Sequence, residues 1–157
     1  MKKLPLSRQT FSKLIEQDLL YIDKTKWVWK LVQEENFYFL SRPRRFGKSL
    51  LLSTFRSFFE GREDLFKDLY IYDKVTEWKQ YPIIYIDYSS ISYRDGLEIF
   101  HISLLSYLQS IARDYDLEIK EKVPADFLRE MIKQLNKKHG SVAVSYTHLT
   151  LPTILRV

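Results

Sequence analysis

The sequence contains no cysteine, which excludes disulfide bonds, cysteine metal ligands and cysteine nucleophiles. No uncharged apolar stretch reaches the roughly 18 to 20 residues that a membrane-spanning helix needs. The basic start, Met1-Lys2-Lys3, leads into polar residues rather than into the apolar run of a secretory signal. We therefore expect a cytoplasmic protein with no membrane partner. Three histidines, His101, His139 and His148, lack metal-ligand spacing, and we interpret them as incidental.

The composition fits one folded domain. The chain has 157 residues, of which 45% are hydrophobic and 29% charged, a balance typical of folded soluble proteins. Aromatic residues make up 15%, so rings with polar edges should build much of the core. The net charge of +5 permits a polyanionic partner without requiring one.

The apolar pattern predicts helices that alternate with buried strands. Two short aromatic and apolar runs, at residues 37–40 and 83–87, indicate strands, and a third strand begins at 141–144. Apolar residues at helical spacing predict helices over 11–19, 23–32, 48–60, 97–111 and 124–139, with short helical turns over 61–79. Helices between buried strands favour an α/β fold with a parallel, doubly wound sheet.

The segment Arg42-Pro43-Arg44-Arg45-Phe46-Gly47-Lys48-Ser49 lies between a predicted strand and a predicted helix. A phosphate-binding loop needs converging backbone N–H groups, a glycine that lets the backbone approach, a lysine for the β- and γ-phosphates and a hydroxyl for Mg²⁺. Gly47, Lys48 and Ser49 supply these groups in order. The usual first glycine, five positions before Gly47, is replaced by Arg42. The setting nevertheless predicts a P-loop.

Two other interpretations of this segment stay open. The arginines could form a solvated basic turn, or the loop Arg42–Lys48 could bind a nucleic-acid backbone.

Two aspartates could likewise have either a functional or a structural role. Asp87 ends a predicted strand, where a carboxylate could hold the water shell of Mg²⁺, but we favour a cap of the turn containing Ser89 and Ser90. We interpret Asp23 as a helix cap rather than a catalytic acid.

Four segments together resemble the AAA-ATPase-like family of bacterial proteins: Leu4-Pro5, 21–25 (Tyr-Ile-Asp-Lys-Thr), 38–50 and 81–87. The resemblance runs from about Leu4 to Ala143. It implies a P-loop NTPase-like parallel sheet with flanking helices, and it makes the arginine at the first-glycine position a family feature. In this family a domain similar to the PD-(D/E)XK nucleases usually follows.

The P-loop interpretation assigns ATP and Mg²⁺ as cofactors, with Ser49 as the metal ligand. It expects nucleotide as the partner and allows nucleic acid as a partner of the parent protein. It assigns no catalytic residue. The expected cofactor-binding residues are Arg44, Arg45, Phe46, Gly47, Lys48, Ser49 and Leu50.

The resemblance also implies a second ATPase motif, an apolar strand that ends in Asp-Glu. Gly140-Ser141-Val142-Ala143 looks like the start of that strand, but no acidic pair follows. Residues 144–157 instead resemble a translated sequencing adapter. Our hypothesis is an N-terminal fragment, with residues 1–143 as part of the P-loop domain and a truncated sheet. Its parent would be an ATPase, whereas the fragment would bind nucleotide with little hydrolysis. The alternative is a genuine terminal strand, which alternating Thr and Leu would suit.

Overall fold

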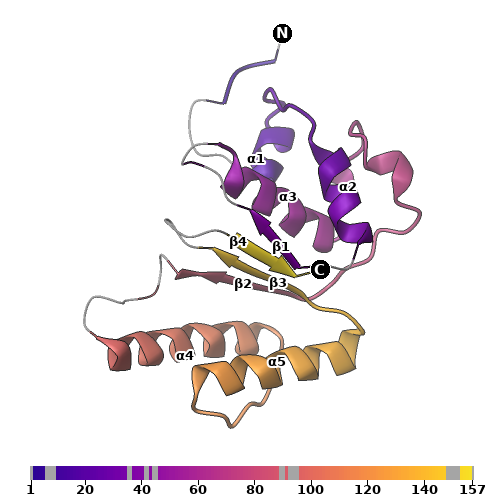
Figure 1. Ribbon diagram of the computed structural model, residues 1–157. Coiled ribbons are helices and arrows are strands. Elements are labelled where there is room, and N and C mark those ends of the chain that lie inside the picture. The colour runs from indigo at the N-terminus through magenta and orange to yellow at the C-terminus, as the bar shows by residue number, and fades with distance from the viewer. Residues whose placement is uncertain are drawn as a thin grey trace.

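The computed structural model describes residues 2–5, 10–34, 37–40, 43, 46–88, 91, 96–147 and 153–156. Helices lie on both sides of a central sheet (Figure 1). The helices are α1 (Phe11–Glu16), α2 (Thr25–Gln33), α3 (Lys48–Phe59), α4 (Leu97–Asp114) and α5 (Pro124–His139), with two 3₁₀ turns, η1 (Glu63–Leu65) and η2 (Tyr72–Lys74). The strands are β1 (Phe37–Leu40), β2 (Ile83–Asp87), β3 (Ala143–Thr147) and β4 (Thr153–Arg156). The predicted α/β class is confirmed.

The sheet is mixed, with strand order β1-β4-β3-β2. Strands β2 and β3 pair in parallel, with Ile83 opposite Ala143, as predicted. Strand β4 is antiparallel to both β1 and β3, so β1, β3 and β2 all point the same way. The prediction of a wholly parallel sheet is therefore wrong at β4. Its cause is chain length, because residues 148–152 alone separate β3 from β4, and a parallel crossover needs a dozen or more residues.

The two faces of the sheet carry separate apolar clusters. Helices α1, α2 and α3 cover one face, and α4 and α5 cover the other (Figure 1). Ile84, Ile86 and Val144 are buried with α4 and α5, whereas Ala143 belongs to the cluster of the first three helices. Successive strand residues thus point to opposite faces, and a strand buried on both faces must be apolar on both. This explains the unbroken apolar run that begins β2.

Aromatic rings fill the cluster around α3. Phe11 and Phe66 are both 0% exposed, and their ring centroids lie 4.8 Å apart. Trp78 packs on Phe66 at 5.0 Å and on Phe58 at 5.7 Å. The prediction that rings build much of the core is confirmed here. These rings hold α1, α3 and the segment after α3 together.

Glycine ends helix α3 where the sequence predicts it. Gly61 has φ 67°, and a Cβ there would lie 2.9 Å from Gln80 Cγ and 3.3 Å from the Lys79 carbonyl oxygen. Both the backbone conformation and the close approach therefore require glycine.

The other predicted helical segments are found with changed bounds. The short turns predicted over 61–79 appear as η1 and η2. Helix α1 ends at Glu16, earlier than predicted. Among the described residues, no helix combines the length and apolar character needed to cross a membrane.

Two tyrosines of the α4 region cover the outer edge of β2. The Tyr115 hydroxyl accepts a hydrogen bond from Ile83 N at 2.7 Å and donates to Ile83 O at 3.1 Å. The Tyr107 hydroxyl donates to Tyr85 O at 3.1 Å. An open strand edge offers unpaired backbone groups to other chains. These hydroxyls occupy such groups, so they protect the edge as well as attach α4 to the sheet.

Removing the Tyr115 hydroxyl should weaken this attachment. We expect Tyr115→Phe to lower the free energy of unfolding by about 1–2 kcal/mol, because Ile83 loses partners for both its N–H and its C=O. Urea denaturation measures the change. Tyr70→Phe is the matched control. Tyr70 is 43% exposed, so removing its hydroxyl should change the free energy of unfolding little. Equal stability of the two variants would contradict a structural role for the Tyr115 hydroxyl.

Candidate phosphate-binding loop

The candidate loop connects β1 to α3. Of its residues, Pro43, Phe46 and Gly47 are described, and Phe46 N donates a hydrogen bond to Pro43 O at 3.4 Å. The predicted order of strand, loop and helix is thus confirmed. Arg42, Arg44 and Arg45 lie outside the described residues. The predicted contribution of Arg44 and Arg45 to phosphate binding stays a prediction.

Gly47 occupies the N-cap position of α3 in a left-handed conformation, with φ 76° and ψ 14°. Its carbonyl accepts the first intrahelical hydrogen bond, from Leu51 N at 2.9 Å. A Cβ at this position would meet nothing within 4 Å, so space does not demand glycine here. The positive φ does, because residues with a Cβ are strained in this region. The glycine sets the turn from which the helix starts.

The first turn of α3 gathers the groups that the motif predicts. Lys48, Ser49 and Leu50 are its first three residues, and no acidic residue lies in this turn. Ser49 is exposed, while Lys48 and Leu50 are half-buried. Phe46 is 63% exposed immediately before the glycine. Residues 46–50 therefore form one short accessible unit in which a cation and a hydroxyl stand at the positive end of a helix dipole.

Asp87 does not lie beside this unit. It ends β2 at the sheet edge where β1 also ends, but β2 is three strand positions from β1. Neighbouring strands lie about 4.8 Å apart, so the two strands are separated by roughly 14 Å. The predicted cap through Ser89 or Ser90 falls on residues outside the description. Burial raises the pKa of Tyr107, and the nearby Asp87 carboxylate opposes ionisation of the same hydroxyl.

Across the part of the chain that the structure describes, no three His, Asp or Glu side chains come together in a group that could hold a metal ion. A single hydroxyl such as that of Ser49 does not form a metal site alone. Mg²⁺ usually keeps several waters and binds through one or two protein groups plus the substrate phosphates. Ser49 fits that limited role.

Asp23 acts as a structural clamp. Its Oδ1 accepts hydrogen bonds from both Thr25 N and Thr25 Oγ1, each at 2.7 Å, and its Oδ2 accepts one from Tyr70 N at 2.7 Å. The Thr25 hydroxyl in turn accepts from Ile71 N at 3.2 Å. The N-cap position of α2 belongs to Lys24, which makes no side-chain cap bond, and Asp23 binds the first N–H group of the helix from the position before it. The same carboxylate also ties α2 to the segment before η2, which the sequence did not reveal.

The Thr25 hydroxyl should matter more than its methyl group. Thr25 is 0% exposed, so Thr25→Val leaves Ile71 N–H without its acceptor inside the protein, at a cost of about 1–3 kcal/mol. Thr25→Ser keeps the hydroxyl and removes one methyl, which costs about 0.8 kcal/mol. Chemical denaturation of both variants measures the difference. A Thr25→Val protein as stable as Thr25→Ser would contradict the clamp.

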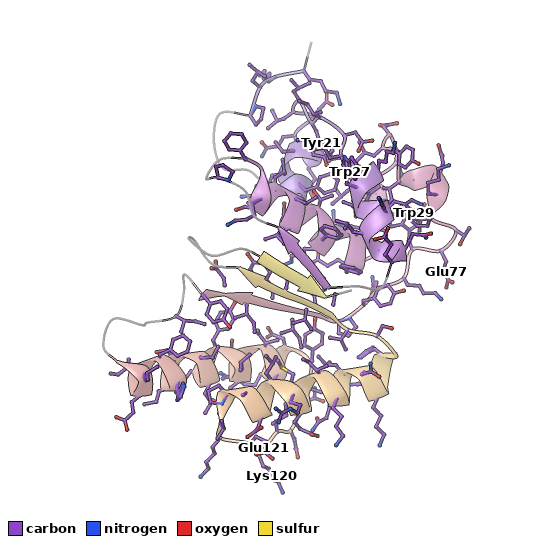
Figure 2. All side chains as sticks on the ribbon, in the orientation of Figure 1. Tyr21, Trp27, Trp29, Glu77, Lys120 and Glu121 are labelled. Carbon is purple, nitrogen blue, oxygen red and sulfur yellow. The ribbon has the colours of Figure 1, made fainter. Side chains whose placement is uncertain are left out.

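A cavity of about 560 Å³ lies away from the phosphate loop. The last turn of α3 contributes Phe58 and Phe59 to its lining, and the start of β3 contributes Ala143. Trp29 and Glu77, which also line it, lie on the same side of the molecule (Figure 2). Lys48 begins the helix that Phe59 ends. The cavity and the loop are therefore at opposite ends of α3 and do not form one site.

The fold and the loop together define the class of protein. The chain is an α/β protein in which a strand leads through a left-handed glycine into a helix that begins Lys-Ser. The sequence pattern of the family described as Predicted AAA-ATPase matches residues 5–145. The chain belongs to this AAA-ATPase-like family. The description of the family supports an ATPase-like function in general terms.

One similar protein is the "Uncharacterized protein in vnfD 5'region" of Azotobacter chroococcum mcd 1. It is 41% identical over 99 residues, which make up 62% of this chain and 19% of the relative. The matched part thus spans about a fifth of the relative's length. No solved structure matches the chain.

Proposed function

We propose that the chain binds Mg-ATP at the start of α3 through a P-loop formed by Gly47, Lys48 and Ser49. The observation that carries the proposal is the left-handed Gly47 at the N-cap of a helix that begins Lys48-Ser49, directly after a strand and a short loop. Family membership supports it. We also propose that the fold is that of a P-loop NTPase.

Each residue of the loop has a distinct role in this proposal. The backbone around Gly47 approaches the phosphates, since glycine offers no side chain to obstruct them. Lys48 neutralises the β- and γ-phosphates with a point charge. Ser49 supplies a hydroxyl to Mg²⁺, whose remaining ligands are phosphate oxygens and water. Phe46, Leu50 and the arginines Arg44 and Arg45 complete the proposed contact set.

The decisive variant is Lys48→Ala. Loss of a charged hydrogen-bond partner costs about 1.5–3 kcal/mol, so the Kd for Mg-ATP should rise by roughly ten- to a hundredfold. Isothermal titration calorimetry measures it. Lys30→Ala is the control, because Lys30 is an exposed lysine on α2 and should leave the Kd unchanged.

Nucleotide binding unaffected by Lys48→Ala would sink the P-loop proposal. Ser49→Ala extends the same experiment, because it should weaken binding in the presence of Mg²⁺ and leave metal-free binding intact. An oligonucleotide that binds in a strongly salt-dependent way, ignores nucleotide and loses little affinity on Lys48→Ala would instead support the nucleic-acid interpretation of the loop Arg42–Lys48.

We propose further that this chain binds ATP more readily than it hydrolyses it. Hydrolysis needs a carboxylate that organises Mg²⁺ or the attacking water. Among the described residues that end β1, β2 and β3 at the loop edge, only Asp87 is acidic, and its strand lies roughly 14 Å from β1. Phosphate release by the purified chain with Mg-ATP should stay at the level of Lys48→Ala. Release well above that level would contradict this part of the proposal.

A further inference from the structure

Ser53 connects the first turn of α3 to the start of α1. Its hydroxyl donates a hydrogen bond to Leu50 O at 2.8 Å and accepts one from Phe11 N at 2.9 Å. Phe11 and Ser53 are 42 positions apart in the sequence, so this is a tertiary link. The link runs from the Phe11 N–H at the start of α1, through the Ser53 hydroxyl, to the Leu50 carbonyl in the first turn of α3.

The Phe11 end of this link is rigidly placed. Phe11 is the first residue of α1, and the first N–H groups of a helix have no partner within the helix. Ser53 supplies the missing acceptor. The Phe11 ring is 0% exposed and packs on Phe66 at 4.8 Å and Tyr21 at 5.2 Å. The position of α1 is therefore fixed independently of the loop.

A second hydroxyl binds the same carbonyl. Thr54 Oγ1 donates to Leu50 O at 2.9 Å, and Thr54 is 0% exposed. Burial raises the pKa of Tyr21, and a hydrogen bond with Thr54 lowers it in part. Tyr21 lies close to α1 (Figure 2). Serine and threonine bonds to backbone carbonyls of the preceding turn often bend helices, so this carbonyl is where the first turn can be tilted.

We propose that Ser53 is a positioning residue for the phosphate site, which transmits the placement of α1 to the first turn of α3. This inference rests on the proposed nucleotide-binding function. Ser53 does not contact the phosphates and acts through its bond to the Leu50 carbonyl. It sets the orientation of Leu50 and therefore of the Lys48 and Ser49 backbone. Binding groups must be held within about 0.5 Å of the productive geometry, so a small tilt of this turn changes affinity.

The test compares two serines of one helix. Ser53→Ala removes the link, whereas Ser57→Ala removes a hydroxyl from a residue that is 5% exposed and lies one turn further from the loop. We expect the Kd for Mg-ATP to rise roughly two- to tenfold for Ser53→Ala and to stay unchanged for Ser57→Ala. Ser53→Thr, which keeps a hydroxyl, should restore binding. Thermal unfolding of each variant shows whether stability explains the difference.

Hydrogen exchange without nucleotide gives a readout that does not depend on ATP. Ser53→Ala should speed exchange of the Phe11 amide and of amides in the first two turns of α3, and Ser57→Ala should not. Should Ser53→Ala fail to fold, Ser53→Cys keeps similar volume with a weak hydrogen-bonding group and should show the same two changes.

Unchanged affinity and unchanged exchange in the Ser53 variants would overturn the positioning role. So would an affinity loss that Ser57→Ala reproduces at equal stability. Failure of the nucleotide-binding proposal looks different, because Lys48→Ala would then leave binding intact. In that case faster hydrogen exchange of the Phe11 amide in Ser53→Ala would still support the link between Ser53 and α1. Exchange at the rate of the unmodified chain would overturn it.

Discussion

The packing of α1 and the aromatic rings against α3 is the interaction on which the rest of the structure depends. Helix α3 is buried through Leu52, Phe55 and Phe59, and Phe11 and Phe66 close over it in the same cluster. Because interiors are close-packed, a shift of one element in such a cluster strains the others. The start of α3, where the proposed phosphate site lies, thus takes its position from the N-terminal helix as well as from the sheet.

The sheet sets what can reach that site. Strands β1, β3 and β2 share a direction, and the antiparallel β4 lies between β1 and β3. Any side chain at the end of β2 is consequently far from the loop after β1. On the outer side of β2, Tyr115 and Tyr107 occupy backbone groups of the edge. The order of the strands therefore explains both the separation of Asp87 from the loop and the protection of this edge.

The local features of the fold could be predicted from the sequence, because they follow from periodicity and from glycine. The strand at 37–40, the helix that begins at Lys48 and its end near Gly61 each depend on a few neighbouring residues. Strand β4 was missed because residues 144–157 were interpreted as a translated adapter, although the short connection after β3 fixes its antiparallel direction once it is a strand. The clamp of Asp23 on Tyr70 N and the link from Ser53 to Phe11 N were missed because contacts between distant segments leave no periodic signal. In the sequence, Asp23 and Ser53 are only polar residues beside apolar ones, a pattern that does not identify their partners.

The electrostatics of the helix ends differ between α3 and α5, which lie on opposite faces of the sheet (Figure 1). Helix α5 follows the usual rules, with Pro124 and Asp126 in its first turn and Lys137, Lys138 and His139 in its last, which complements the helix dipole. Helix α3 begins with Gly47, which has no capping side chain, followed by the cation Lys48. The positive end of the helix dipole attracts anions, so a bound anion would be attracted by both the dipole and the lysine. Departures from local rules are expected at functional sites. The start of α3 is such a departure, and a phosphate group is the kind of ligand that suits it.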